Sequence, residues 1–223
     1  MTMRAKQIKI QIVYPRVVAD DGVGNCLLEI CRGLADSFQV VVFAREFSGV
    51  TNVKWIRVRS PRRPLVLQYI WFLACTPFML DKKQETITIG TEGYVRDPDI
   101  AYVHMPTARL SHNESAVADL RQFFSMLNLR VHGYRENKAL MRAQLLVVPS
   151  SELVKELNWD TRKQSMIIGN PLDGLWWYPS AERQHGKSTR HSLFGPGMMH
   201  TLAFVANGRF EHKGLGILLE ALS

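Results

Sequence analysis

Apolar and polar positions along this chain alternate between two periods, one typical of buried strands and one typical of helices. Short apolar runs predict strands at Ile8–Tyr14, Gln39–Ala44, Lys54–Arg59, Thr86–Gly90, Ile100–Met105, Leu145–Pro149 and Ser165–Gly169. Strands that alternate with helices indicate an α/β fold with a mainly parallel, doubly wound, Rossmann-like sheet. The mixed pattern of 54–59 places that strand nearer an edge of the sheet.

Helical spacing predicts helices over about 25–36, 116–143 and 150–158. The first has Asn25 as its N-cap and an apolar stripe of Leu27, Ile30, Cys31 and Leu34. The apolar stripe of the long helix consists of Leu120, Phe123, Phe124, Leu127, Val131 and Tyr134. Short loops between these elements fit crossover connections in a parallel sheet.

The stretch Leu65–Leu80 is nearly all apolar and is interrupted only by Gln68 and Thr76. It contains Pro77 and is shorter than the roughly 20 residues that a transmembrane helix needs. Two interpretations stay open, a buried crossover helix and a helix that also docks on a membrane surface. We favour the buried helix, because apolar runs of this length usually lie in a protein core.

The end of the chain predicts a further strand at Thr201–Ala206, a turn at Asn207-Gly208 and a helix opening at Lys213-Gly214. Arg209 and Lys213 then lie where backbone N–H groups and the helix dipole favour an anion, which indicates a phosphate-bearing ligand. The alternative is a surface loop that is merely basic. Residues 172–200 have little periodicity, so we divide the chain into a domain at 1–171, a connection at 172–200 and the start of a second domain at 201–223.

The formal charge of +8 favours anionic partners without saying which kind. The three cysteines lack C-x-x-C spacing, which predicts free thiols, a reducing compartment and no metal site. The first fifteen residues resemble neither a secretory signal nor a membrane span. We therefore expect a cytoplasmic protein, with a peripheral contact at the inner face of the membrane left open.

Three loops share one kind of location, because ligands of doubly wound sheets bind beyond the carboxyl ends of the strands. They are the loop Arg16–Gly24, the turn at His104 and the loop Arg209–Lys213. This shared rim is where the sequence predicts the functional site.

Four pieces of the chain, in order, resemble GT-B glycosyltransferases of family 4, the retaining "group 1" class. They are IKIQIVYP…DGVGNCLLEICRGLA, VVPSSELVKEL, IIGNPLDGLWWYPS and FVANGRFEHKGLGILLEAL. The resemblance implies two Rossmann-like domains and transfer of a sugar from a nucleotide-sugar to an acceptor hydroxyl with retention. It implies no metal and no permanently bound cofactor. The acceptor would be a glycan, a lipid-linked sugar or a small molecule, as in carbohydrate biosynthesis.

The same resemblance assigns roles to individual residues. Gly22 and Gly24 would form the loop that approaches the donor diphosphate and the acceptor. Arg209 and Lys213 would neutralise the departing nucleoside diphosphate. His104 matches a histidine that touches the donor sugar in some relatives, and the alternative is a histidine that merely ends a buried strand.

The chain departs from the family beyond Lys213, because the pair of glutamates that holds sugar and ribose would lie after Ser223. The expectation is a chain truncated early in its second domain and inactive, or nearly so, by itself. A non-catalytic remnant that binds a partner or a membrane surface is therefore the alternative function. A nucleotide-dependent oxidoreductase is a weaker one.

Other motifs are weaker. Asp97-Pro98-Asp99 has the D-x-D spacing of some metal sites, but proline and the following strand favour a turn. Gly22-x-Gly24 with Glu46 as a ribose acid is an incomplete dinucleotide fingerprint, because Leu27 replaces its third glycine.

Four basic residues share one side of the long helix and would suit an acidic acceptor if they faced it: Arg121, Arg135, Lys138 and Arg142. No aromatic residues interleave with basic ones, so no nucleic-acid partner is expected.

Overall fold

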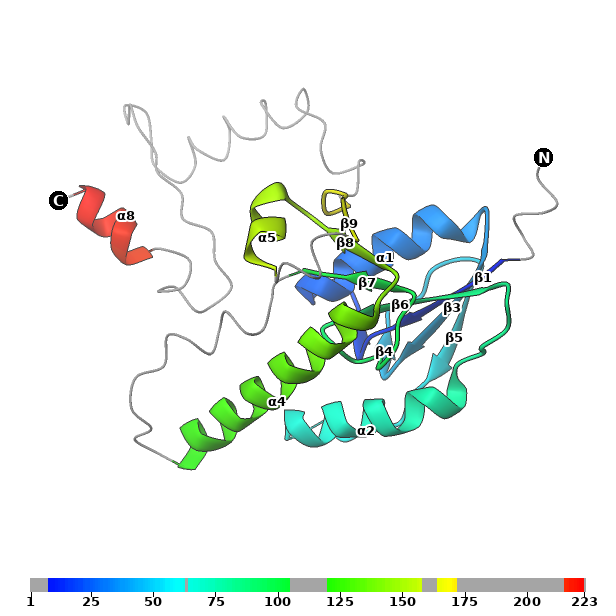
Figure 1. The fold of residues 1–223 in the computed structure, drawn as a ribbon, viewed down its shortest axis with the longest axis horizontal. Coiled ribbons are helices and arrows are strands. Elements are labelled where there is room, and N and C mark those ends of the chain that lie inside the picture. Colours follow the sequence, from blue (N-terminus) through cyan, green and yellow to red (C-terminus); the bar gives the residue numbers. More distant parts are fainter. Residues whose placement is uncertain (1–7, 63, 105–119, 158–163, 172–214, 223) are drawn as a thin grey trace, which may run out of the picture. The chain divides into compact units, whose positions relative to one another are not determined.

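The computed structural model describes residues 8–62, 64–104, 120–157, 164–171 and 215–222, with the backbone alone for 120–125 and 222 (Figure 1). The chain divides into two compact units, Met1–Leu172 and Asp173–Ser223. In the second unit the described element is helix α8 (Leu215–Leu222), which begins close to the predicted start. The predicted strand 201–206 and the connection 172–200 lie outside the described residues, so the division into domains stays a prediction.

The first unit is built on a seven-stranded sheet in which every pairing is parallel (Figure 1). Its order is β5 (Val53–Arg57), β3 (Gln39–Ala44), β1 (Lys9–Val13), β6 (Thr86–Thr91), β7 (Ile100–Tyr102), β8 (Leu145–Val148) and β9 (Ser165–Ile167). All seven strands predicted in this part of the chain are confirmed, and so is the edge position of 54–59. The small strands β2 (Arg16–Val17) and β4 (Glu46–Phe47) pair separately.

Alternate residues of the central strands face opposite layers of the protein, as the pleat requires. Ile12 and Val42 pack under helix α1 (Gly22–Ala35), whereas Val13 and Val41 belong to the core on the other side. Helix α2 (Leu65–Met79) covers that second side and packs against α4 (Leu120–Arg142) (Figure 1). Helices on both faces confirm the doubly wound α/β class.

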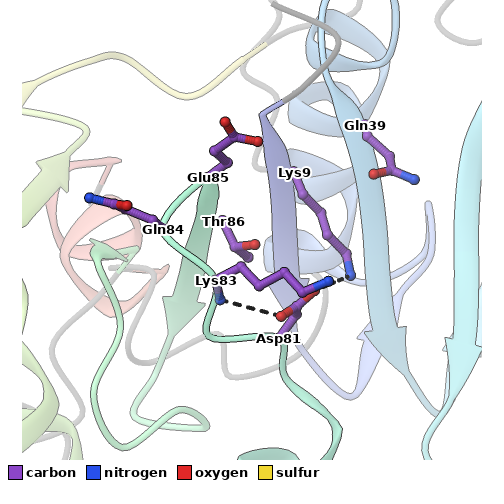
Figure 2. Close-up of a pocket in the computed structure, with 7 residues that line it drawn as sticks. All are labelled: Lys9, Gln39, Asp81, Lys83, Gln84, Glu85 and Thr86. Atoms are coloured by element: carbon purple, nitrogen blue, oxygen red, sulfur yellow. Dashed lines mark hydrogen bonds and ion pairs between the residues drawn. The ribbon is translucent and has the colours of Figure 1, made fainter.

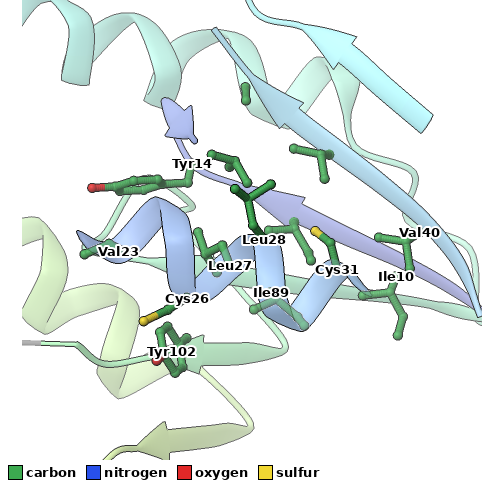
Figure 3. Packing of buried hydrophobic residues seen from close by; sticks show 14 residues of the cluster. Ile10, Tyr14, Val23, Cys26, Leu27, Leu28, Cys31, Val40, Ile89 and Tyr102 are labelled. Carbon is green, nitrogen blue, oxygen red and sulfur yellow. The ribbon is translucent and has the colours of Figure 1, made fainter. Parts of the chain in front are cut away.

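Helix α1 begins three residues before its predicted start. Its N-cap is Asp21, whose carboxylate accepts a 2.8 Å hydrogen bond from the Gly24 amide, so the predicted cap Asn25 is wrong. The helix buries Leu27, Leu28 and Cys31 against the sheet (Figure 3). Two glycines near the start suggested a loop, but a good cap and this buried stripe are enough to form a helix.

We predicted a buried helix at Leu65–Leu80, and this is wrong for the side of α2 that faces solvent. The side of α2 that faces the protein buries Gln68, Tyr69, Phe72 and Thr76. The other side leaves large apolar groups in solvent, with Phe78 91% exposed. None of the helices in the described parts of the chain is long and apolar enough to cross a membrane.

The long helix was predicted in the right place with the wrong buried stripe. In α4 the predicted stripe residues Leu127 and Tyr134 are 43% and 59% exposed, whereas Glu136 and Ala139 are buried. Leu140 is buried as well and packs with Leu146 and Val148, so α4 buries a different side from the predicted one. The short helix α5 (Ser151–Glu156) follows, with the Ser150 hydroxyl accepting from the Leu153 amide as its cap.

Candidate functional site

The strand order reverses at β1, which has β3 on one side and β6 on the other. In a doubly wound sheet this switch point opens a crevice beyond the carboxyl ends of the strands. Tyr14 follows β1 there, Glu92 follows β6, and Asp21 caps the adjoining helix α1. We call these residues, with the nearby Glu136 of α4, the switch-point site.

Glu92 is the central group of this site. Its backbone is in the left-handed region at φ 50°, which is uncommon for a residue with a side chain. Burial, helped by the charges of Glu136 and Asp21, raises the pKa of the Glu92 carboxyl from 4.5 to about 7, although a hydrogen bond with Tyr14 opposes the shift. A carboxyl group with this pKa can either accept or donate a proton near neutral pH.

A group of aromatic rings supports the loop that carries Glu92. Gly93 has φ 71° and its carbonyl accepts a 2.9 Å hydrogen bond from the Tyr69 hydroxyl of α2. The Tyr69 ring meets His132 of α4 edge to face at 4.4 Å, and Tyr94 contacts both rings. Burial lowers the pKa of His132 from 6.5 to about 4, so this histidine is neutral at physiological pH.

A second polar link lies along the same edge. The Tyr102 hydroxyl donates a 2.6 Å hydrogen bond to Oδ1 of Asn170, and Tyr102 also forms a hydrogen bond with Cys26 of α1. The segment after β9 is thereby joined to β7. His104, which the sequence proposed for the donor sugar, lies half-buried just after β7 at this edge.

The structure places the two glycines of the predicted diphosphate loop in the first turn of α1. Around Gly22 an added Cβ would meet nothing within 4 Å, whereas at Gly24 it would lie 2.1 Å from the Arg16 carbonyl oxygen. The Gly24 amide already donates to Asp21. Gly24 thus has a structural reason to be glycine, and its predicted contact with a diphosphate stays a prediction.

The basic residues of α4 differ in their surroundings. The Arg142 guanidinium forms a 2.9 Å ion pair with Asp97, which precedes β7 and so lies at the amino edge of the sheet, away from the switch point. Lys138 lies over the Tyr134 ring. Arg135 is half-buried, and its positive charge opposes the rise in the pKa of Tyr69 that burial causes. The Arg121 side chain, Arg209 and Lys213 lie outside the described residues, so the acceptor-side and diphosphate roles of these residues remain predictions.

The weaker motifs have structural explanations. Asp99 accepts a 2.7 Å hydrogen bond from the Thr88 amide and a second bond from the Gln144 side chain, and Asp97 pairs with Arg142. In the parts of the chain that the structure describes, no cluster of side chains is suited to a metal ion. Glu46, the candidate ribose acid, forms 3.0 Å ion pairs with Arg16 and Arg45, which lower its pKa against the opposing effect of burial.

A hollow of about 490 Å³ opens at the opposite, amino-terminal edge of the sheet (Figure 2). Asp81 lies between Lys9 and Lys83 there, at 3.4 Å and 4.0 Å. Charged side chains and polar residues at the amino ends of strands line this hollow. None of the residues of the switch-point site belongs to it. Ligands of doubly wound sheets bind beyond the carboxyl ends of the strands, so the candidate site at that edge stays a prediction.

Three carboxylates gather at the switch-point site, and the charges of Arg16, Arg45 and Arg135 also act on its tyrosines. Asp21, Glu92 and Glu136 come from three separate elements, so no local pattern connects them. A local signal was Glu92-Gly93, which begins two residues after the end of the predicted strand Thr86–Gly90. Carboxylates accept hydrogen bonds from hydroxyl groups and repel phosphate, so this part of the edge suits a polyhydroxylated molecule better than a diphosphate.

Comparisons with known proteins agree on the architecture. No protein-family model matches the sequence, and no curated protein matches it significantly. Among solved structures, the chain is similar to WaaG, a glycosyltransferase involved in lipopolysaccharide biosynthesis, with a TM-score of 0.64 and 13% identity over 96% of this chain. The likeness establishes the shared GT-B-like α/β fold, and the chain spans 58% of the WaaG chain.

Two further solved structures are less similar. Medicago truncatula UGT71G1, complexed with UDP-glucose, has a TM-score of 0.49 at 10% identity over 80% of this chain and 55% of its own. Anabaena Alr3699/HepE, also in complex with UDP-glucose, has a TM-score of 0.43 at 13% identity over 83% of this chain and 50% of its own. Both scores are below the level at which a shared fold follows.

Proposed function

We propose that this chain belongs to a glycosyltransferase that moves a sugar from a nucleotide-sugar donor to an acceptor hydroxyl. The observation that supports this most is the similarity of fold to WaaG over 96% of the chain. The motif resemblance covers the same order of elements and suggests the family 4 class, with retention of configuration and no need of a metal. A cytoplasmic location with peripheral membrane contact completes the proposal.

In this proposal the two ends of the reaction are held by different parts of the chain. The carboxylates of the switch-point site would accept hydrogen bonds from acceptor hydroxyls, and Glu92, with a pKa of about 7, would orient the attacking one. Arg209 and Lys213 would bind the donor diphosphate and stabilise the charge that develops on it. His104 would contact the sugar.

Saturation-transfer NMR on the chain with a panel of nucleotide-sugars and neutral oligosaccharides tests this division directly. We expect Arg209→Ala to remove the nucleotide-sugar signal and to leave the oligosaccharide signal, and Glu92→Gln to do the reverse. Binding of NAD(P) with no nucleotide-sugar binding would contradict the proposal and favour an oxidoreductase. The absence of any small-molecule binding would favour the non-catalytic remnant.

Turnover provides a second test. We expect the 223-residue chain to release little or no nucleoside diphosphate from nucleotide-sugars by itself. In any longer form that turns over, Arg209→Ala should lower the rate by about 100-fold or more, as removal of a charge-stabilising donor typically does. A loss below about threefold would show that Arg209 is no phosphate ligand.

A further inference from the structure

The side of α2 that faces away from the protein carries only apolar side chains. This outer face consists of Leu67, Ile70, Trp71, Ala74, Pro77 and Phe78. Leu67, Ile70 and Trp71 are 51%, 50% and 47% exposed, and Phe78 is 91% exposed. At about 100° per residue these positions fall on one arc of the helix, opposite the residues that pack on the sheet.

This arrangement differs from an ordinary surface helix, which exposes polar groups on the side that faces solvent. Here the buried side includes Gln68 and Thr76, and the Gln68 side-chain nitrogen has no hydrogen-bond partner. The solvent side has neither a charged nor a hydrogen-bonding group apart from the Trp71 indole. A continuous exposed apolar surface of this kind marks an interaction site.

Cationic side chains stand at both ends of the same helix. Arg62 precedes it with its side chain 83% exposed, and Lys83 follows it at 81% exposed. Their nearest acidic groups, Glu46 and Asp81, lie at 3.7 Å and 4.0 Å and are each shared with other cations. Arg59 and Lys82 are also exposed beside them. The ends of α2 therefore attract anions while its middle excludes charge.

We propose that the outer face of α2 docks on the surface of an anionic lipid bilayer, with the helix lying parallel to the membrane plane. The apolar side chains would enter the boundary between headgroups and acyl chains, and the flanking cations would contact lipid phosphates. The proposal holds whether or not the chain transfers sugars.

The charges distinguish a bilayer from a second copy of the chain. A symmetric contact through α2 would bring the basic ends of two identical helices together, so like charges would oppose the apolar attraction. A lipid surface supplies an apolar layer and negative charge in the same plane. The overall charge of +8 acts in the same direction.

Co-sedimentation of the full chain with vesicles tests the proposal, comparing phosphatidylcholine alone with phosphatidylcholine containing about one third phosphatidylglycerol. We expect binding to the anionic vesicles only, and weaker binding at high salt. Phe78→Ser should lower the partition coefficient about tenfold or more, because the exposed ring would no longer enter the lipid. The matched control is Met141→Ser, a 52% exposed apolar side chain on α4, which should change partitioning less than about twofold.

The cations need their own variant. Lys82→Gln combined with Lys83→Gln leaves the apolar face intact and should weaken binding to anionic vesicles about tenfold or more. Quenching of tryptophan fluorescence by brominated lipid locates the contact independently, since Trp71→Phe keeps an aromatic ring but removes the reporter. Quenching should fall markedly in that variant.

Three results would overturn the proposal. The first is that the chain does not bind anionic vesicles. The second is that Phe78→Ser binds them as well as the parent does, while circular dichroism shows that the variant is folded. The third is that lipid quenching of tryptophan fluorescence is the same in Trp71→Phe as in the parent, and this measurement decides if Phe78→Ser does not fold. Sedimentation velocity that shows a dimer lost in Phe78→Ser would assign the outer face to a second copy instead.

Discussion

The Tyr69 hydroxyl on the buried side of α2 donates a 2.9 Å hydrogen bond to the Gly93 carbonyl, directly after Glu92. One helix therefore supports the loop of the switch-point site with one face and presents the exposed apolar surface with the other. An added Cβ at Gly93 would lie 2.7 Å from both the Tyr69 hydroxyl and the Glu136 amide nitrogen. The loop, α2 and α4 are consequently packed too closely for any larger residue at Gly93.

Gly93→Ala should destabilise the chain strongly. Gly93 has φ 71°, which costs an alanine about 1 kcal/mol, and the close contact with the Glu136 backbone adds a further cost of about 1–3 kcal/mol. Gly49 separates the two effects, since it has φ 81° but nothing within 4 Å of an added Cβ. In urea denaturation, Gly49→Ala should lose only the smaller amount. Equal losses in the two variants would contradict the packing argument.

Gly24→Ala and Gly22→Ala form a similar pair at the start of α1. The Gly24 substitution should destabilise the fold, because its Cβ would lie 2.1 Å from the Arg16 carbonyl oxygen, whereas Gly22→Ala should be nearly neutral. Thermal melting measures the difference. A fully stable Gly24→Ala chain that had lost nucleotide-sugar binding would instead identify Gly24 as a ligand contact.

Glu92 should make stability depend on pH. Because the pKa of Glu92 is about 7 in the folded chain and its ordinary value is 4.5, the folded chain retains a proton that the unfolded chain releases between these values. Its contribution is therefore fully present below about pH 4.5 and is lost as pH rises through about 7, by at most about 3 kcal/mol. Glu92→Gln should be more stable than the parent at pH 8, by urea denaturation. If stability depends on pH in the same way in Glu92→Gln and in the parent, the pKa of Glu92 is not raised and the prediction is wrong.

His132 should act in the opposite direction. Its pKa is lowered from 6.5 to about 4, so the unfolded chain binds more protons between these values and stability falls as pH decreases through this range. His132→Phe keeps a ring beside Tyr69 and removes the titration. We expect this variant to lose less stability than the parent between pH 6.5 and pH 4, measured by thermal melting. A steeper loss in the variant would contradict the assignment.

Tyr69→Phe tests the link between α2 and the switch-point site. Loss of the hydrogen bond to Gly93 leaves a buried carbonyl without this donor and should cost about 1–2 kcal/mol. Tyr134→Phe is the control, because Tyr134 is 59% exposed on α4, and it should stay within about 0.5 kcal/mol of the parent. Hydrogen exchange should be faster at the amides around Glu92 in Tyr69→Phe alone.

The pattern of residues was enough to predict the sheet. Short runs such as Val40–Ala44 are apolar at successive positions, as in a strand buried on both faces, and helical spacing between such runs leaves few topologies. The shared carboxyl edge followed from the parallel arrangement. Local chemistry also located the start of the short helix α5 near residue 150.

The sequence by itself therefore determined the class of fold, because periodicity and capping are local properties of the chain. Only the tertiary structure decided which groups meet at the carboxyl edge of the sheet and which side of α2 is buried. Asp21, Glu92 and Glu136 influence one another across segments far apart in sequence. The outer face of α2 looked like core in the sequence, since apolar composition does not reveal which side of a helix the sheet will cover.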